Sequence, residues 1–396
     1  MATLDADRAI DVIHGTLPIR KFSAPEIIMG DGSRNLVGQY VLSLSGKNVF
    51  LVSDPGIFKA GWAGEVIGEL ESSGINVVVY DGVSPNPKSS EVMRGAEVYE
   101  EAGCDLIVSV GGGSSMDCGK AIGAVVSNQC DVLELEGIDE VVMPAPPFIC
   151  IPTTAGSSAD VSQFAIINDE QKKRKFAIIS KTMIADLALV DPETTVTMDP
   201  ELTATTGIDA LSHAFEAYVS NASSVITDMY ALEAVKLVAE YLPKAYGEPD
   251  NLMFRDKVML GSMYAGLAFS NASLGLVHAM AHSLGGYNDS PHGECNAQLL
   301  EHVVAFNYSH AEAKYRDLEA AMSGKVPSKN SGPDGLIREL RNMTSELDIV
   351  PGLCHMGVKE DDLEYLSENA YVDPCLATNP CPATKKDIER IYHESL

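Results

Sequence analysis

Four side chains on two segments of the chain are of the types that hold a metal ion. Asp209 and His213 are four residues apart in GIDALSHAFEAYVS, and His278 and His292 lie in GLVHAMAHSLGGYNDSPHG. His282 follows His278 at the same spacing, so a helix would present the members of each pair on one face. Three imidazoles and a carboxylate form a mixed N and O ligand set that suits a divalent first-row ion such as Fe²⁺ or Zn²⁺. Two such pairs and a further histidine after a Gly-Gly break favour a metal site over ordinary core or surface histidines.

A glycine-rich segment elsewhere in the chain has the features of a phosphate-binding turn. GGGSSMDCGKAIG follows the strand-like stretch CDLIVSV, and a helix N-terminus after such a turn can hold a pyrophosphate with its N–H groups. The turn is not a GxGxxG motif, because Met116 takes the place of the third glycine. PTTAGSS (152–158) also follows a strand-like stretch, and ligands of open α/β sheets collect at such strand ends.

Asp54 closes another strand-like stretch, NVFLVSD. A carboxylate at this place can accept a hydrogen bond from an adenosine ribose hydroxyl and would repel a 2′-phosphate. This position therefore favours NAD over NADP.

The order of patterns along the chain predicts two domains. Apolar β-branched stretches at 48–54, 75–83, 104–110 and 147–154 alternate with helical patterns such as 89–103, which is typical of a buried parallel sheet. Long helical stretches dominate from about Pro200. We expect an α/β nucleotide-binding domain with a Rossmann-like parallel sheet over residues 1–197. An all-α metal-binding and catalytic domain would follow over residues 198–396.

Composition and charge narrow the class of protein. The 396 residues are 45% hydrophobic and 21% charged, no apolar run is long enough to span a membrane, and the N-terminus lacks a secretory signal pattern. A net charge of −28 disfavours binding to nucleic acid or to anionic membranes. Eight cysteines without CxxC pairs favour free thiols, so we expect a cytoplasmic enzyme with a small-molecule substrate.

Taken in order, the motifs GGGSxxD, PTTAGS, GxDAxxHAxExYxS, GLVHAMAHxLGG and PHG resemble the iron-containing alcohol dehydrogenase family. The resemblance is to the branch that includes lactaldehyde reductase and 1,3-propanediol dehydrogenase, and it runs from about residue 22 to residue 392. It implies a dehydroquinate synthase-like architecture of two domains and a homodimer or higher homo-oligomer. It also implies that Asp209, His213, His278 and His292 are the metal ligands, with Fe²⁺ as the expected ion and Zn²⁺ or another divalent ion as the alternative.

The same resemblance assigns further site residues. His282 would lie near the nicotinamide and the substrate, where an imidazole could relay a proton to solvent or could only pack beside the site. Substrate-pocket walls would include Phe164, Phe269 and Cys375. The positions expected to bind NAD(H) are Asp54, Asn86, Gly112, Gly113, Ser114, Asp117, Thr153, Thr154, Ile166 and Lys175.

The activity implied is hydride transfer between NAD(H) and a small primary alcohol, a diol or the corresponding aldehyde, with the metal as a Lewis acid. The resemblance leaves two related enzymes as alternatives. A 3-dehydroquinate synthase-like enzyme would need a cluster of basic residues for a phosphate and a carboxylate, which the helical half does not offer near the ligands. A glycerol dehydrogenase-like enzyme would dispense with one of the histidines. A non-catalytic binding protein is disfavoured because both the metal set and the cofactor loop are intact.

Overall fold

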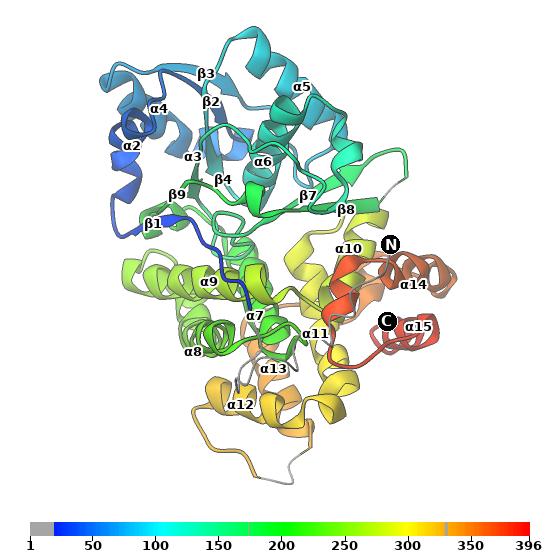
Figure 1. The fold of residues 1–396 in the computed structure, drawn as a ribbon. Helices are drawn as coiled ribbons and strands as arrows, with labels where there is room; N and C mark the ends of the chain where they lie inside the picture. The colour runs from blue at the N-terminus through cyan, green and yellow to red at the C-terminus, as the bar shows by residue number, and fades with distance from the viewer. Residues whose placement is uncertain (1–19, 173, 329–331) are drawn as a thin grey trace, which may run out of the picture.

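A computed structural model describes residues 20–172, 174–328 and 332–396, which form an α/β part and a helical part (Figure 1). The α/β part is built on a six-stranded sheet in which every neighbouring pair is parallel. The predicted strands at 48–54, 75–83, 104–110 and 147–154 are confirmed. In spatial order the strands are β1 (Glu26–Met29), β9 (Leu187–Val190), β6 (Phe148–Pro152), β4 (Leu106–Gly111), β2 (Asn48–Val52) and β3 (Asn76–Tyr80).

Both faces of this sheet are buried, which explains why its strands are apolar at successive positions. Phe50 and Val52 of β2 belong to the apolar cluster that includes Val92 and Ile122 of the helices on one face. Val49 and Leu51 alternate with them and belong to the cluster on the other face. The helices of this part are α2 (Val37–Ser43), α3 (Pro55–Ala60), α4 (Trp62–Ser72), α5 (Ser89–Glu101) and α6 (Gly113–Asn128).

A second sheet beside the first was not predicted. It has three strands in the order β5 (Gly137–Ile138), β8 (Arg174–Ile179) and β7 (Phe164–Asp169). β7 and β8 are antiparallel, and their register pairs Asn168 with Lys175. The hairpin therefore places Phe164, Ile166 and Lys175 on adjacent strands.

The helical part begins at Pro200, and the predicted helical texture from that point is confirmed. The apolar stretch from 251 to 286 forms two helices, because α9 ends at Ala272 and α10 begins at Leu276. The expected domain boundary between 197 and 198 lies between η4 (Pro192–Thr195) and α7, and it remains a prediction. The helices are α7 (Pro200–Val219), α8 (Val225–Gly247), α9 (Leu252–Ala272), α10 (Leu276–Asn288), α11 (His292–Asn307), α12 (Glu312–Ser323), α13 (Asp334–Glu346), α14 (Leu363–Tyr371) and α15 (Lys385–Glu394).

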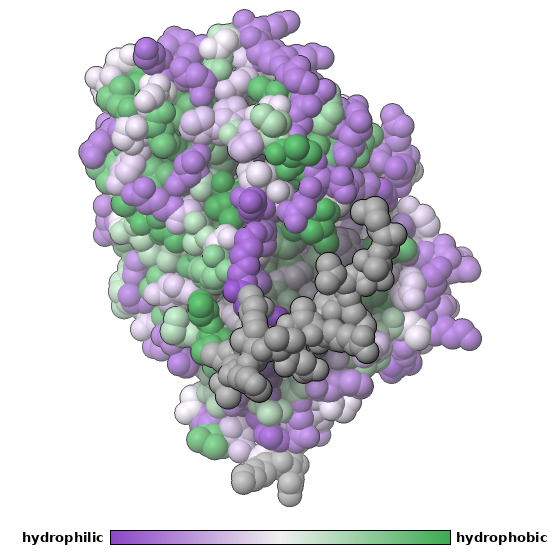
Figure 2. Space-filling view, viewed as in Figure 1, coloured by the Kyte–Doolittle hydropathy of each residue, from purple (hydrophilic) through white to green (hydrophobic). Residues whose placement is uncertain are grey.

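Hydrophilic residues crowd the top and right-hand edges of the face in Figure 2, in keeping with the net charge of −28. Within the described ranges, no helix is both long enough and apolar enough to cross a membrane.

Candidate active site and metal centre

A cavity of about 840 Å³ is lined by residues of both parts of the molecule. On the α/β side it meets the loops that follow β2, β4 and β6, which are the carboxyl ends of parallel strands. On the helical side it is lined by residues of α7, α9, α10 and α11. All ten residues expected to bind the cofactor line this cavity, as do Phe164, Phe269 and His282.

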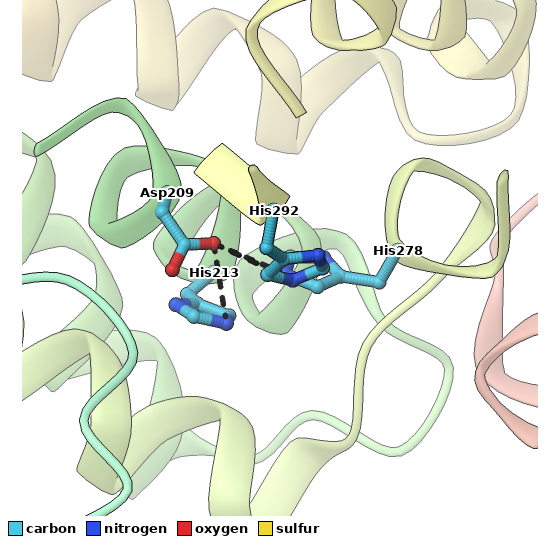
Figure 3. A group of neighbouring side chains, drawn as sticks. All are labelled: Asp209, His213, His278 and His292. Atoms are coloured by element: carbon cyan, nitrogen blue, oxygen red, sulfur yellow. Dashed lines mark ion pairs between the residues drawn. The ribbon is translucent and has the colours of Figure 1, made fainter. Parts of the chain in front are cut away.

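The four expected metal ligands converge at one point of the cavity (Figure 3). Asp209 and His213 project from α7, His278 from α10, and His292 from the first position of α11. Oδ1 of Asp209 lies 3.8 Å from Nε2 of His213 and 3.7 Å from Nε2 of each of the other two histidines. One ligand-type atom from each residue lies within 4.8 Å of the other three, so a single ion could contact all four.

The protonation of this group also suits a cation. Burial lowers the pKa of His213 to about 3 and holds that of His292 well below its usual value, so both rings are neutral at neutral pH. Burial alone would raise the pKa of Asp209, but the adjacent histidines bring it below the usual range. Burial would lower the pKa of His278, yet the neighbouring carboxylates of Asp209 and Glu216 raise it to about 9. A carboxylate and neutral imidazoles are the forms that bind metals, so Asp209, His213 and His292 suit a divalent ion as they stand, whereas His278 must first lose the proton on Nε2.

Two neighbours hold these ligands in place. Nδ2 of the buried Asn296 donates to Oδ1 of Asp209 at 2.7 Å and lies 3.3 Å from Nε2 of His278. Oδ1 of Asn296 has no hydrogen-bond partner in the described part of the chain. Phe269 stacks on the ring of His213 with 4.3 Å between ring centroids. Asn296 was not predicted as a site residue.

His282 lies beside the metal ligands and has its own carboxylate partner. Its ring stacks on that of His292 with 5.2 Å between ring centroids, and its Nδ1 lies 2.9 Å from Oδ2 of Asp373. A carboxylate at Nδ1 favours the tautomer with the proton on that nitrogen and leaves Nε2 as an acceptor. Cys375, expected as a wall of the substrate pocket, does not line the cavity; its thiol lies within 4.8 Å of ligand-type atoms of His282 and Asp373.

The glycine-rich loop leaves a helix N-terminus open to the cavity. Gly112 is the N-cap residue of α6 and offers no side chain to the first N–H groups. A Cβ on Gly113 would lie 2.7 Å from Oγ of Ser157, and one on Gly111, where φ is +156°, would lie 2.5 Å from Oγ of Ser115. These positions therefore exclude side chains and let a ligand approach the backbone.

Asp54 performs a local role in addition to lining the cavity. Its Oδ1 accepts hydrogen bonds from the N–H groups of Gly56 and Ile57 and caps α3, and its Oδ2 accepts from Ser115 at 3.1 Å. The Asp-Pro pair at 54–55 is a sequence signal for such a helix start.

A polar link joins the two parts across the cavity. Nδ2 of Asn86 donates to Oδ1 of Asp289 at 2.6 Å, and Nζ of Lys175 donates to Oδ1 of Asn86 at 2.6 Å. Asp289 ends α10 and was not predicted as a site residue. Burial lowers the pKa of Lys175.

Comparison with known proteins identifies the family. The model of the iron-containing alcohol dehydrogenase family matches residues 24–192, and that of the C-terminal part of the Fe-containing alcohol dehydrogenase family matches residues 203–396. Alcohol dehydrogenase 4 of Schizosaccharomyces pombe is 39% identical over 381 residues, which cover 96% of this chain and 90% of that protein. The 1,3-propanediol dehydrogenase of Citrobacter freundii is 37% identical over 92% of this chain and 96% of its own length.

A solved structure supports the same assignment. The crystal structure of a 1,3-propanediol oxidoreductase superimposes with a TM-score of 0.93 at 35% identity, over 96% of this chain and all of that one. The predicted family and its 1,3-propanediol dehydrogenase branch are therefore confirmed. The chain belongs to the iron-containing alcohol dehydrogenase family, which implies NAD and a divalent metal ion.

Proposed function

We propose that the chain is an NAD-dependent, divalent-metal-dependent alcohol dehydrogenase or aldehyde reductase. It would transfer hydride between the nicotinamide ring and a small primary alcohol, a diol or the corresponding aldehyde. The observation that carries this proposal is that the four metal-ligand candidates line the same cavity as the glycine-rich loop of α6. When bound, the divalent ion would supply Lewis-acid polarisation of the substrate oxygen.

The residues around the loop would bind the cofactor. The free N–H groups at the start of α6 would hold the pyrophosphate, which the positive end of the helix also attracts. Asp54 would accept a hydrogen bond from a ribose hydroxyl, because each carboxylate oxygen keeps lone pairs beyond those used by α3 and Ser115. Its charge would disfavour a 2′-phosphate.

The walls of the cavity favour a small neutral substrate. The rings of Phe164 and Phe269 lie 5.7 Å apart, and Phe269 packs against His213, so apolar surface adjoins the metal ligands. Lys175 is the only Lys or Arg among the described residues that line the cavity, and its Nζ donates to Asn86. An anionic substrate would therefore lack a free cationic side chain to bind it.

His282 would handle the proton of the substrate hydroxyl. With its Nδ1 facing Asp373, the ring can accept a proton at Nε2 and return it in the reverse reaction. The partly buried Asp373 would stabilise the charged ring. We propose Fe²⁺ as the native ion from membership of the family; the N and O ligand set also suits Zn²⁺, so metal analysis distinguishes them.

We also propose a cytoplasmic location and a homodimer or larger homo-oligomer. All eight cysteines are free, which suits a reducing compartment. Light scattering on the purified, metal-loaded protein gives the mass of the assembly.

The experiment for the proposed activity follows NADH absorbance with a panel of short aldehydes and alcohols. We expect metal-loaded wild type to turn over with NAD(H). His292→Ala should lose both metal and turnover, whereas the surface control His310→Ala should keep both. Metal-loaded wild type that oxidises and reduces none of these compounds would overturn the proposal.

A further inference from the structure

Glu216 is a buried carboxylate that the reaction outlined above does not use. It lies on α7 three residues after His213, and it is 4% exposed. Oε2 of Glu216 accepts from Nδ1 of His278 at 2.7 Å. The nitrogen of His278 that faces Glu216 is thus opposite the one that faces Asp209.

The same carboxylate occupies the N-terminus of α10. It accepts backbone N–H groups of Gly275 at 3.0 Å, Val277 at 2.6 Å and His278 at 3.3 Å. The intervening N–H, that of Leu276, donates to Oδ1 of Asn379 at 3.1 Å. Side chains from other elements therefore satisfy all four N–H groups that begin this helix, which has no cap from its own N-cap residue.

Gly275 gives the carboxylate the space to do this. A Cβ at position 275 would lie 2.9 Å from Oε1 of Glu216 and 2.9 Å from Oδ1 of Asn379. Any side chain there would displace both caps. The break between α9 and α10 thus leaves backbone N–H groups at the start of α10 whose hydrogen bonds are accepted by side chains of other elements.

We propose that Glu216 is a positioning residue that builds the metal site from outside it. Its carboxylate fixes the proton of His278 on Nδ1, aims Nε2 at the other ligands, and ties the start of α10 to α7. The inference rests on the proposed metal site. The carboxylate is the acceptor in each of its four hydrogen bonds, so a carboxamide, which carries one acceptor oxygen and an NH₂ group, cannot replace it.

The test measures metal affinity by competition between Zn²⁺ and a chelator, without reference to turnover. Loss of such an outer carboxylate lowers metal affinity by roughly 10–100-fold, and we expect that loss in Glu216→Gln. Asn379→Ala is the matched control, because it removes a cap from the same helix without touching a metal ligand. Its metal affinity should fall less than threefold. Near-UV circular dichroism and NADH binding establish that each variant is folded.

The outcomes separate the inference from the proposed metal site. Wild type that binds no Zn²⁺ would overturn the metal site itself. Wild-type affinity in Glu216→Gln would overturn only the role of Glu216, and an equal loss in Asn379→Ala would reduce that role to helix capping.

If Glu216→Gln does not fold, two further measurements test the positioning role of Glu216. Nitrogen NMR of labelled histidines in the wild type should show His278 with its proton on Nδ1 once Zn²⁺ is bound, and a proton on Nε2 would refute the assignment. Gly275→Ala, which would displace the carboxylate without deleting it, should weaken Zn²⁺ binding by at least about tenfold; unchanged binding would refute it as well.

Discussion

The metal affinity of this chain should depend on pH through the protonation state of one expected ligand, His278. His213 and His292 are neutral and Asp209 is charged at neutral pH, so these three residues are ready to bind a cation. His278 differs, because the carboxylates of Asp209 and Glu216 outweigh the effect of burial and raise its pKa to about 9. An incoming ion must therefore displace one proton, from Nε2 of His278.

Metal affinity should increase with pH up to the pKa of His278. Below a pKa of about 9 the proton competes with the metal, so affinity should rise about tenfold per pH unit, or roughly 100-fold between pH 6 and pH 8. Above pH 9 the slope should vanish. In the metal-free protein the charged His278 stabilises the fold most fully below pH 6.5, its ordinary pKa, and this contribution is lost as pH rises through about 9.

Two measurements check this prediction. Chelator competition with Zn²⁺ at several pH values gives the slope, and proton release in weak buffer gives the number of protons displaced, about one per metal at pH 7. A metal affinity that does not change between pH 6 and pH 8, with no proton released, would refute the assigned state of His278.

Three further predictions concern other residues. His282→Ala should keep metal and cofactor but lose roughly 10²–10⁴-fold in rate near neutral pH, with a smaller loss at high pH where hydroxide accepts the proton. A pH–rate profile like that of the wild type would assign His282 only a packing role. Asp54→Gly should raise the use of NADPH relative to NADH in steady-state assays, because the charge that repels a 2′-phosphate is gone; a wild type that already uses both cofactors equally would contradict the placement of Asp54. Cys354 is the one fully exposed cysteine, so a thiol reagent should modify about one thiol rapidly in the native protein. Rapid modification of more than three thiols would show that cysteines buried in the structure are accessible, since Cys104 and Cys130 are partly exposed.

The sequence predicted the parts of the site that depend on local spacing. Asp209 and His213 lie one turn apart on a single helix, so their common face follows from helical geometry alone. The strands that end at Gly111 and Pro152 could also be predicted, because a parallel sheet buried on both faces requires apolar runs.

The sequence could not predict contacts between residues that are distant along the chain. Asn296 meets Asp209 across 87 residues, and His282 meets Asp373 across 91, so no spacing rule connects them. The hairpin of β7 and β8 was missed for another reason. Its short strands are partly polar at Asn168 and Lys175, and they pair antiparallel beside a parallel sheet.

We propose that Asp209, His213, His278 and His292 hold one metal ion on which NAD-linked turnover depends. The most direct test titrates Fe²⁺ without oxygen into metal-depleted enzyme, and it follows bound metal and NADH oxidation with a short aldehyde in the same samples. We predict that the metal-depleted enzyme is inactive, that activity rises in proportion to bound metal, and that it saturates at about one ion per chain. Full activity in the metal-depleted enzyme, or restored activity in His278→Ala at the same metal concentration, would contradict this account.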